Sequence, residues 1–215
     1  MSVAEFASAK TETVAKRLTA GYERGLSALK HFDGLGPLAL RLYLGPIFVL
    51  AGWKKLTDID STIQWFANPD WGLGLPMPEL LAWLASLSEF VGGLALLLGL
   101  GVRFFSVPLM VTMIVAAVTV HWPYGWQAIA DPSWLYANER VNESAVRLAR
   151  AKEILQEYGN YAWLTARGNF VILNNGIEFS ITYFVMLLAL LFTGGGRYVS
   201  ADYWIARRLR AGRTS

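Results

Sequence analysis

Four stretches of the chain are long, apolar and almost free of charge, and the segments between them are more polar. The four stretches cover residues 35–53, 80–100, 104–122 and 171–193. The hydrocarbon core of a bilayer is about 30 Å thick, so a helix needs about 20 apolar residues to cross it. The pattern therefore predicts an all-α membrane protein built as a bundle of four transmembrane helices.

The connecting segments differ strongly in length. Little more than residues 101–103 separates the second stretch from the third, which predicts a tight transmembrane hairpin. The connection between the third and fourth stretches, residues 123–170, is long, and within it Glu139–Tyr158 repeats apolar side chains at helical spacing. We expect an amphipathic helix there, outside the bilayer, serving either as a lid packed on the bundle or as a docking surface for a partner.

Composition narrows the class of protein. Hydrophobic residues make up 54% of the chain and charged residues 16%, whereas about 25% of the residues in soluble domains are charged. The chain has no cysteine, which excludes a disulfide framework or a thiol relay built from this chain alone. The net charge of +3 does not indicate nucleic-acid binding, because the basic residues gather at the two ends of the chain without a recognisable binding motif.

The basic residues predict the orientation of the bundle. Lysine and arginine close to the spans favour the cytoplasmic side. They occur in the N-terminal segment, at Arg103 in the short hairpin and in the C-terminal tail, which all lie on one side if the chain crosses four times. The opposite side holds acidic residues in 57–79 and a balanced number of charges in 123–170. We therefore expect both termini to be cytoplasmic.

This orientation divides the chain into three parts. Residues 1–34 form a basic segment that is either an interfacial helix or a loosely ordered tail, residues 35–200 form the four-helix domain, and residues 201–215 form a basic cytoplasmic tail. The lipid bilayer is the partner that this division implies directly.

Glu89 is the only charged residue in the second stretch. An ionisable group inside a span costs roughly 2.5 to 3.5 kcal/mol on insertion scales, so it usually faces the protein interior. On a helix Glu89 shares a face with Ser86, Gly92 and Gly93, and small residues let a second helix come close. We expect Glu89 to face a helix–helix seam rather than lipid.

The first stretch carries a comparable stripe. Helical spacing places Arg41, Gly45, Gly52 and Lys55 on one face and Lys54 on the opposite face. Lys55 is thus expected to point inward, while Lys54 extends toward the headgroups. Gly45 and Gly52 would let a second helix approach the same face closely.

Two further polar groups belong to the outer ends of the third and fourth stretches. Helical side chains lean toward the N-terminus of their own helix, so under the predicted orientation Glu89 and Glu178 lean outward. Lys55 and His121 lean inward, and the four groups converge in the outer leaflet beneath an aromatic rim. The candidate ligand-binding residues are Lys55, Glu89, His121, Glu178, Arg41 and Trp122.

A structural role is the alternative for this cluster, in which the charges only fix the register of the helices. A metal site is not expected, because the chain has only two histidines and they lack the close spacing of paired metal ligands.

Three segments resemble the DoxX family of small four-span membrane proteins. They are RLYLGPIFVLAGWKKL at 41–56, SEFVGGLALLLGLGVR at 88–103 and GGGRYVSAD at 194–202. Two parts of the chain are most similar to the HvfX-type branch of this family: the long loop 123–170 and the segment LNNGIEFSITYFVMLLALLFTGGGRY at 173–198. This branch is found with copper-responsive peptide maturation systems. The resemblance implies a bacterial inner-membrane protein. It also implies that Arg41, Lys55, Glu89 and Arg103 are motif residues of the family, but it assigns no reaction to them.

Some members of the family resemble the membrane subunit of a thiosulfate:quinone oxidoreductase, and others take part in oxidative-stress complexes. The leading hypothesis is an accessory subunit without independent catalytic activity. Its outward-facing polar pocket would bind a quinone or another small lipophilic ligand, in a redox or copper-stress pathway shared with periplasmic or membrane partners. The alternatives are a quinone-linked oxidoreductase subunit, which needs a cofactor that the sequence does not identify, and a scaffold that recruits partner proteins. Each is compatible with a homodimer.

Overall fold

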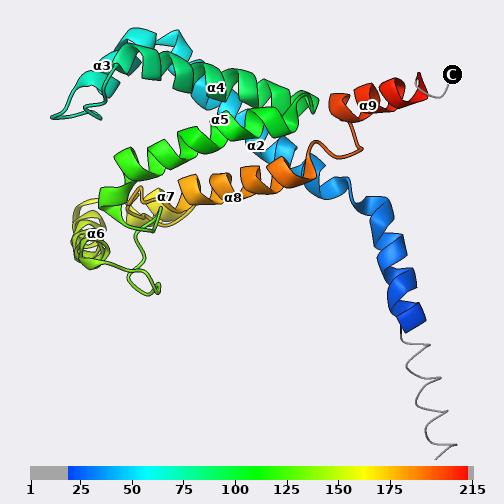
Figure 1. The fold of residues 1–215 in the computed structure, drawn as a ribbon. Helices are drawn as coiled ribbons and strands as arrows, with labels where there is room; N and C mark the ends of the chain where they lie inside the picture. The colour runs from blue at the N-terminus through cyan, green and yellow to red at the C-terminus, as the bar shows by residue number, and fades with distance from the viewer. Residues whose placement is uncertain (1–18, 213–215) are drawn as a thin grey trace, which may run out of the picture.

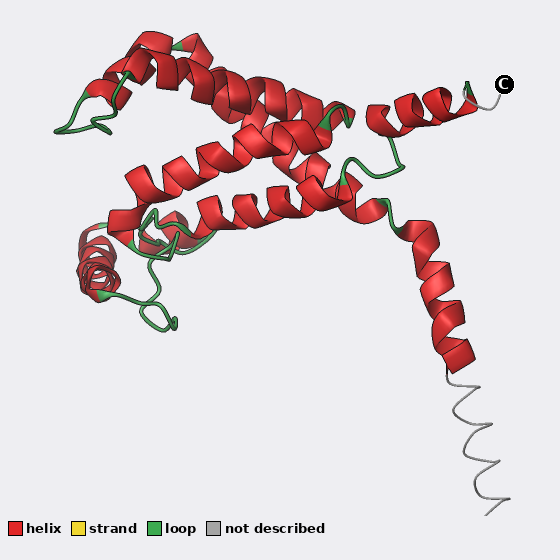
Figure 2. Ribbon diagram, in the orientation of Figure 1, coloured by secondary structure: helices red, strands yellow, loops and turns green. Residues whose placement is uncertain are grey.

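The computed structural model describes residues 19–212, and this part of the chain is helical apart from its connecting loops and one isolated bridge between Ile129 and Leu173 (Figures 1 and 2). The expected all-helical class is confirmed. Residues 19–29 are also helical. The further helices are η1 (Lys30–Phe32), α2 (Leu35–Thr57), α3 (Ile59–Ala67), α4 (Pro78–Leu98), α5 (Val102–Val115), the π-helical turn η2 (Ala116–His121), η3 (Trp122–Tyr124), α6 (Glu139–Tyr158), α7 (Tyr161–Thr165), α8 (Glu178–Thr193) and α9 (Ala201–Ala211).

Within residues 19–212, three helical segments are long and apolar enough to cross a membrane, namely Thr19–Thr57, Pro78–Leu98 and Val102–Tyr124. The fourth apolar helix, α8, has 16 residues and is therefore about 24 Å long. The prediction that this span starts at residue 171 is wrong. Asn175 adopts a left-handed conformation with φ 62°, and the N–H groups just before α8 bond to carbonyls of residues 125–128, so the chain becomes helical only at Glu178.

Helices α2 and α4 approach each other closely because glycines line their interface. A Cβ atom added to Gly93 would lie 2.6 Å from the backbone nitrogen of Val49, and one added to Gly45 would lie 2.6 Å from Leu97 Cγ. Gly52 likewise faces the backbone of Phe90. These contacts confirm the predicted small-residue seam.

Helix α5 packs against both α4 and α8 (Figure 1). Leu109 of α5 fills the space opposite Gly92 of α4. The shared core contains the following buried residues: Leu44, Phe48, Leu96, Val102, Leu109, Met113, Leu187 and Leu190. The core therefore joins the α2–α4 pair to the α5–α8 pair.

The turn between α4 and α5 is as tight as the sequence predicts. Gly99 and Gly101 adopt left-handed conformations with φ 65° and 57°, which glycine reaches without steric cost. Both residues also bond to the start of α9, because the N–H of Asp202 donates to the Gly99 carbonyl at 2.9 Å and the Asp202 carboxylate accepts the N–H of Gly101 at 2.7 Å. The C-terminal helix is thereby attached to the hairpin.

The predicted helix Glu139–Tyr158 is confirmed with the same bounds as α6. It begins at Asn138, whose side-chain oxygen accepts a hydrogen bond from the N–H of Val141 at 3.0 Å, a typical N-cap. Of the predicted N-terminal interfacial segment, residues 1–18 lie outside the described residues. The predicted basic tail 201–215 contains α9.

Candidate functional site

The Lys55 ammonium forms an ion pair with Oε2 of Glu89, which joins α2 to α4 inside the apolar bundle. The Glu89 side chain is 6% exposed and that of Lys55 is 29% exposed. Because α2 and α4 are antiparallel and side chains lean toward their own N-terminus, the two groups lean toward each other. The expectation that both residues face the seam is confirmed.

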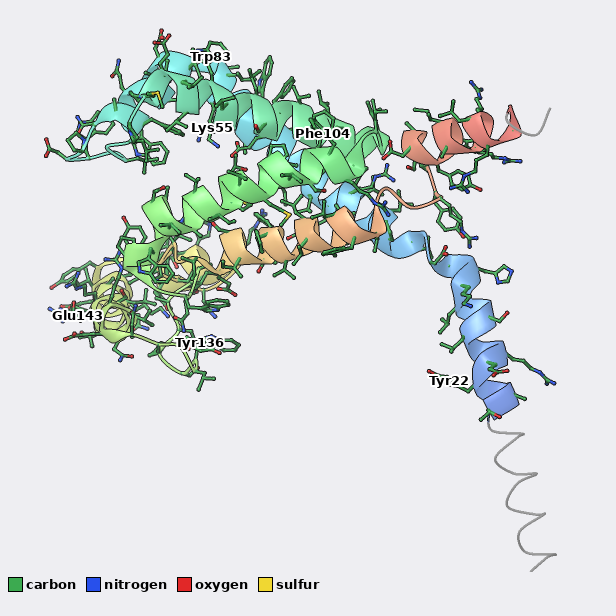
Figure 3. The ribbon with its side chains drawn as sticks, in the orientation of Figure 1. Tyr22, Lys55, Trp83, Phe104, Tyr136 and Glu143 are labelled. Atoms are coloured by element: carbon green, nitrogen blue, oxygen red, sulfur yellow. The ribbon has the colours of Figure 1, made fainter. Side chains whose placement is uncertain are left out.

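The ion pair leaves hydrogen-bonding capacity unused. An ammonium group has three N–H donors and a carboxylate accepts through both oxygens. Within residues 19–212, Lys55 Nζ bonds only to Glu89, and Glu89 Oε1 has no partner. Figure 3 draws Lys55 on the side of the α2–α4 pair that faces α5. A partly exposed donor therefore lies next to a buried acceptor in an apolar surrounding.

An aromatic contact also joins α2 to α4. Trp53 of α2 and Phe90 of α4 pack with their ring centroids 5.7 Å apart, and each is close in sequence to one member of the ion pair. The Thr62 hydroxyl of α3 donates to the Lys55 carbonyl at 3.3 Å. The end of α2 is thereby held by α3 as well as by α4.

Glu178 occupies a different junction, at the first residue of α8. Its Oε2 accepts a hydrogen bond from the N–H of Ala128 at 2.8 Å, and its own N–H donates to the Trp126 carbonyl at 2.9 Å. The carboxylate thus fastens the loop after η3 to the start of α8. This role of Glu178 could not be predicted from the sequence, because its partner is a backbone N–H, which is present at nearly every residue.

His121 belongs to the same junction. Its Nδ1 lies 2.8 Å from the carbonyl oxygen of Asn175. The buried Asn174 amide donates to the carbonyls of Tyr124 at 2.8 Å and Gln127 at 2.7 Å, and Arg140 Nε donates to its Oδ1 at 3.2 Å. These bonds tie the long loop 123–170 and α6 to the ends of α8 and of the third apolar segment.

The structure therefore separates the predicted cluster into two groups. Lys55 pairs with Glu89, whereas His121 and Glu178 both bond to loop backbone at the η2–α8 junction. Among the described residues no hydrogen bond or ion pair links the two groups. Trp122 is exposed beside His121 at the end of the third apolar segment, where an aromatic rim was predicted.

A cavity of about 290 Å³ lies beside Glu178. It is lined by Gln127, Ala128, Ile129, Asp131, Trp134, Glu178 and Phe179. The hydroxyl and then the N–H of Ser133 donate to the Asp131 carboxylate, and these bonds hold the pKa of that carboxyl below its usual range. The Asp131 carboxylate therefore stabilises the turn at Ser133.

Arg41 lies near the other end of α2, 14 residues from Lys55 or about 21 Å along the helix axis. It is fully buried, and all its nitrogens donate to backbone carbonyls. Nε bonds to Leu96 (2.7 Å), Nη1 to Gly195 (2.7 Å) and Tyr198 (3.3 Å), and Nη2 to Leu97 (3.0 Å) and Val199 (2.8 Å). The structure thus places Arg41 apart from the Lys55–Glu89 pair.

Asp202 completes the group around Arg41 and was not recognised from the sequence as a functional residue. Its two oxygens accept the N–H groups of Gly101 at 2.7 Å and Val102 at 3.0 Å, at the start of α5. Asp202 is also the acidic group that interacts electrostatically with Arg41. The sequence signal was available in the segment GGGRYVSAD, which ends on this residue.

No three His, Asp or Glu side chains within residues 19–212 are grouped so that they could hold a metal ion. The Lys55–Glu89 pair offers hydrogen bonding and charge inside the described bundle.

The DoxX family model matches residues 36–122, which contain α2 to η2 and both members of the ion pair. Two curated bacterial proteins are similar to part of the chain. "Putative oxidoreductase CatD" of Bacillus subtilis (strain 168) is 32% identical over 91 residues, which cover 42% of this chain and 63% of the relative. "Inner membrane protein YphA" of Escherichia coli (strain K12) is 33% identical over 94 residues, covering 41% and 61%.

The chain thus spans a little under two thirds of the length of these curated relatives. No solved structure matches the chain. Over residues 36–122 the chain is thus similar to the DoxX family, and its apolar helices together with the similarity to an inner membrane protein suggest a bacterial membrane protein.

Proposed function

We propose that this protein is an accessory subunit of the bacterial inner membrane in which the Lys55–Glu89 pair binds a quinone or a similar small lipophilic ligand. The observation that carries the proposal is the ion pair itself. It lies between apolar helices, and its donor and acceptor are only partly used within the described chain. Catalysis, in this proposal, belongs to partner proteins, and this subunit holds the ligand.

The chemistry of the pair suits a ligand that exists as both quinone and quinol. A free N–H of Lys55 donates to a quinone carbonyl, and Oε1 of Glu89 accepts from a quinol hydroxyl. The apolar helices α2 and α4, between which the pair lies, supply an apolar surrounding for the ring. Ligand sites of this kind combine an apolar lining with few polar groups that fix orientation.

The topology in this proposal has four crossings with both termini in the cytoplasm. Helix α8 is the fourth, although it is shorter than the other spans. Its Leu187 and Leu190 are fully buried while Val185 and Phe192 are exposed, as expected for a helix with one face on the bundle and one on lipid. A short span is accommodated by local thinning of the bilayer at modest cost.

The pathway is proposed to be a redox or copper-stress pathway. The name of the Bacillus subtilis relative supports a redox connection, and the long outer loop resembles that of the HvfX-type branch. A quinone-linked oxidoreductase subunit is the alternative, and it requires a bound chromophore. A visible absorption spectrum of the purified protein separates the two, because the accessory role predicts no absorption band from this chain.

A binding measurement tests the proposed site. The full chain is reconstituted in lipid nanodiscs and titrated with a short-chain benzoquinone, and binding is followed by tryptophan fluorescence. We expect Lys55→Met to weaken binding about tenfold or more, since a hydrogen bond to a charged group contributes about 1.5–3 kcal/mol. The matched control is Lys54→Met, which removes the exposed neighbouring lysine and should leave affinity unchanged. Equal affinity in both variants would overturn the proposal.

A scaffold is the second candidate function, and α6 is the observation that favours it. This helix exposes Val146 and Ile154 together with two ion pairs of its own, Arg147–Glu143 and Arg150–Glu153. Replacing the exposed side chains of α6 should abolish pathway activity under the scaffold hypothesis. The same replacement should leave benzoquinone affinity unchanged if the Lys55–Glu89 pair is the binding site.

A further inference from the structure

The cavity beside Glu178 carries two carboxylates that no basic side chain neutralises. Glu178 is the first residue of α8, and Asp131 belongs to the turn at Ser133. Among the described residues no lysine or arginine lines the cavity, and no ion pair includes either carboxylate. Figure 1 shows the start of α8 at the end of the bundle opposite α9. The cavity therefore holds two acidic groups without a counter-charge.

Each of these carboxylates uses one oxygen to hold the loop and leaves the other oxygen without a partner. Oε2 of Glu178 accepts the N–H of Ala128 at 2.8 Å, and Oδ1 of Asp131 accepts the hydroxyl of Ser133 at 2.6 Å and its N–H at 2.9 Å. Within residues 19–212 no hydrogen bond reaches Oε1 of Glu178 or Oδ2 of Asp131. A carboxylate accepts hydrogen bonds through both oxygens, so each has one oxygen available to a donor in the cavity.

Aromatic rings complete the lining of the cavity. Trp134 and Phe179 both line it, and each side chain is about half exposed. Phe179 stacks on Tyr183 with the ring centroids 6.1 Å apart, which holds its ring in place. The face of an aromatic ring attracts a cation, and tryptophan does so most strongly. Carboxylates and aromatic rings together favour an organic cation over a neutral or acidic ligand.

The size and the polar groups of the cavity restrict the kind of cation. A volume of about 290 Å³ is close to the lower end of the range for small-molecule sites, so the ligand is small. Within the described chain no third acidic or histidine side chain joins the two carboxylates to hold a metal ion. A primary ammonium has three N–H donors, as in lysine, and these are enough for both available oxygens.

We propose that this cavity binds a small primary amine in its ammonium form. The ammonium donates to Oε1 of Glu178 and Oδ2 of Asp131, and the apolar body of the amine packs against Trp134 and Phe179. The proposal does not depend on the ligand proposed for Lys55 and Glu89, because neither residue lines this cavity.

A pair of probes that differ only in charge tests the proposal. The full chain is reconstituted in phosphatidylcholine nanodiscs and titrated by calorimetry with phenethylamine and with phenethyl alcohol, which has the same ring and chain but a neutral hydroxyl. Empty nanodiscs correct for partition of each probe into lipid. We expect the amine to bind about tenfold or more tightly than the alcohol, because hydrogen bonds between charged groups are the stronger ones.

Variants of the lining assign the bound amine to this cavity. Asp131→Asn and Glu178→Gln each remove one charge but keep an oxygen that can accept the loop N–H, and each should weaken amine binding about tenfold. Trp134→Leu should weaken it about two- to fivefold, through loss of the cation–π contact. The matched control is Asp70→Asn, which removes an exposed carboxylate from the loop between α3 and α4 and should leave amine affinity unchanged.

Four results would overturn the proposal. Heat no larger than that of empty nanodiscs would mean that the chain does not bind the amine. Equal affinity for the amine and the alcohol would mean that the carboxylates do not recognise an ammonium group. Unchanged amine affinity in both Asp131→Asn and Glu178→Gln would place the bound amine elsewhere. A loss in Asp70→Asn as large as in Asp131→Asn would show a response to overall negative charge rather than to this cavity.

Discussion

Arg41 and Lys55 are both basic residues of α2, yet their surroundings differ in kind. Arg41 directs its donors to five backbone carbonyls from two separate segments, the end of α4 and residues 195–199. Lys55 bonds to one carboxylate oxygen and remains 29% exposed. A charge whose hydrogen bonds are complete holds a structure together, whereas one with unused bonds is available to a ligand.

Side-chain chemistry explains why each residue type occupies its place. The planar guanidinium of arginine presents five donors in a fixed fork, which suits several carbonyls at once. Lysine is a compact ammonium on a flexible stem, so it can move toward a second acceptor without losing the first. The difference between the two sites can be tested by removing each in turn.

The largest effect is expected at Arg41. Arg41→Met leaves carbonyls of Leu96, Gly195 and their neighbours without donors in a buried place, so the free energy of unfolding should fall by about 3–5 kcal/mol. Thermal unfolding of the purified protein in detergent measures it. An unchanged thermal unfolding midpoint would show that the hydrogen bonds of Arg41 do not stabilise the fold.

The next largest loss of stability is expected at Gly93, in the close α2–α4 interface that holds Lys55 next to Glu89. Gly93→Val places side-chain atoms against the backbone of Val49, so α2 and α4 must separate at a cost of about 1–3 kcal/mol. Lys55 and Glu89 should separate with them, and benzoquinone affinity should fall together with stability. The matched control is Gly36→Ala, because a Cβ at Gly36 meets no atom within 4 Å. Equal losses in both variants would argue against the close seam.

A smaller change in stability is expected at the ion pair. Glu89→Gln keeps the shape of the side chain and leaves a lysine that is partly hydrated, so the free energy of unfolding should fall by only about 1–2 kcal/mol. Ligand affinity should fall in the same variant, since the carboxylate oxygen is lost. A decrease in the free energy of unfolding as large as that of Arg41→Met would show that Glu89, like Arg41, mainly stabilises the fold.

The smallest effect is expected for an exposed ion pair. Arg147 and Glu143 of α6 are 78% and 57% exposed, and pairs of this kind contribute about 0.3–0.5 kcal/mol. Arg147→Gln should shift the unfolding midpoint very little and leave benzoquinone affinity intact. A large loss of stability would mean that α6 packs on the rest of the protein through this pair.

The sequence predicted those features that depend on spacing along one helix. Glu89 and Lys55 were assigned to a seam because small residues recur on their faces, and α6 was predicted at its observed bounds because apolar side chains repeat along it at helical spacing. Side-chain lean then brought the two charges together across antiparallel helices.

The features that the sequence did not predict depend on backbone partners. The carbonyls that bind Arg41 and the N–H of Ala128 that binds Glu178 exist at every position of a chain, so they leave no signal in residue types. Helical spacing placed Arg41 and Lys55 on one face, but it did not reveal that Arg41 meets a loop from the far end of the chain. The late start of α8 has the same cause, because the backbone N–H groups of residues 174–178 bond to carbonyls of residues 125–128.

Exchanging the two charges tests the central claim most directly. The double variant Lys55→Glu with Glu89→Lys keeps an ion pair between α2 and α4 but moves the ammonium to the buried position. The account predicts that the double variant unfolds close to the midpoint of the unmodified protein, while its benzoquinone affinity stays about tenfold or more weaker, because donor and acceptor no longer lie where the ligand needs them. Recovery of full affinity together with stability would contradict the account, since the pair would then serve only to hold the helices.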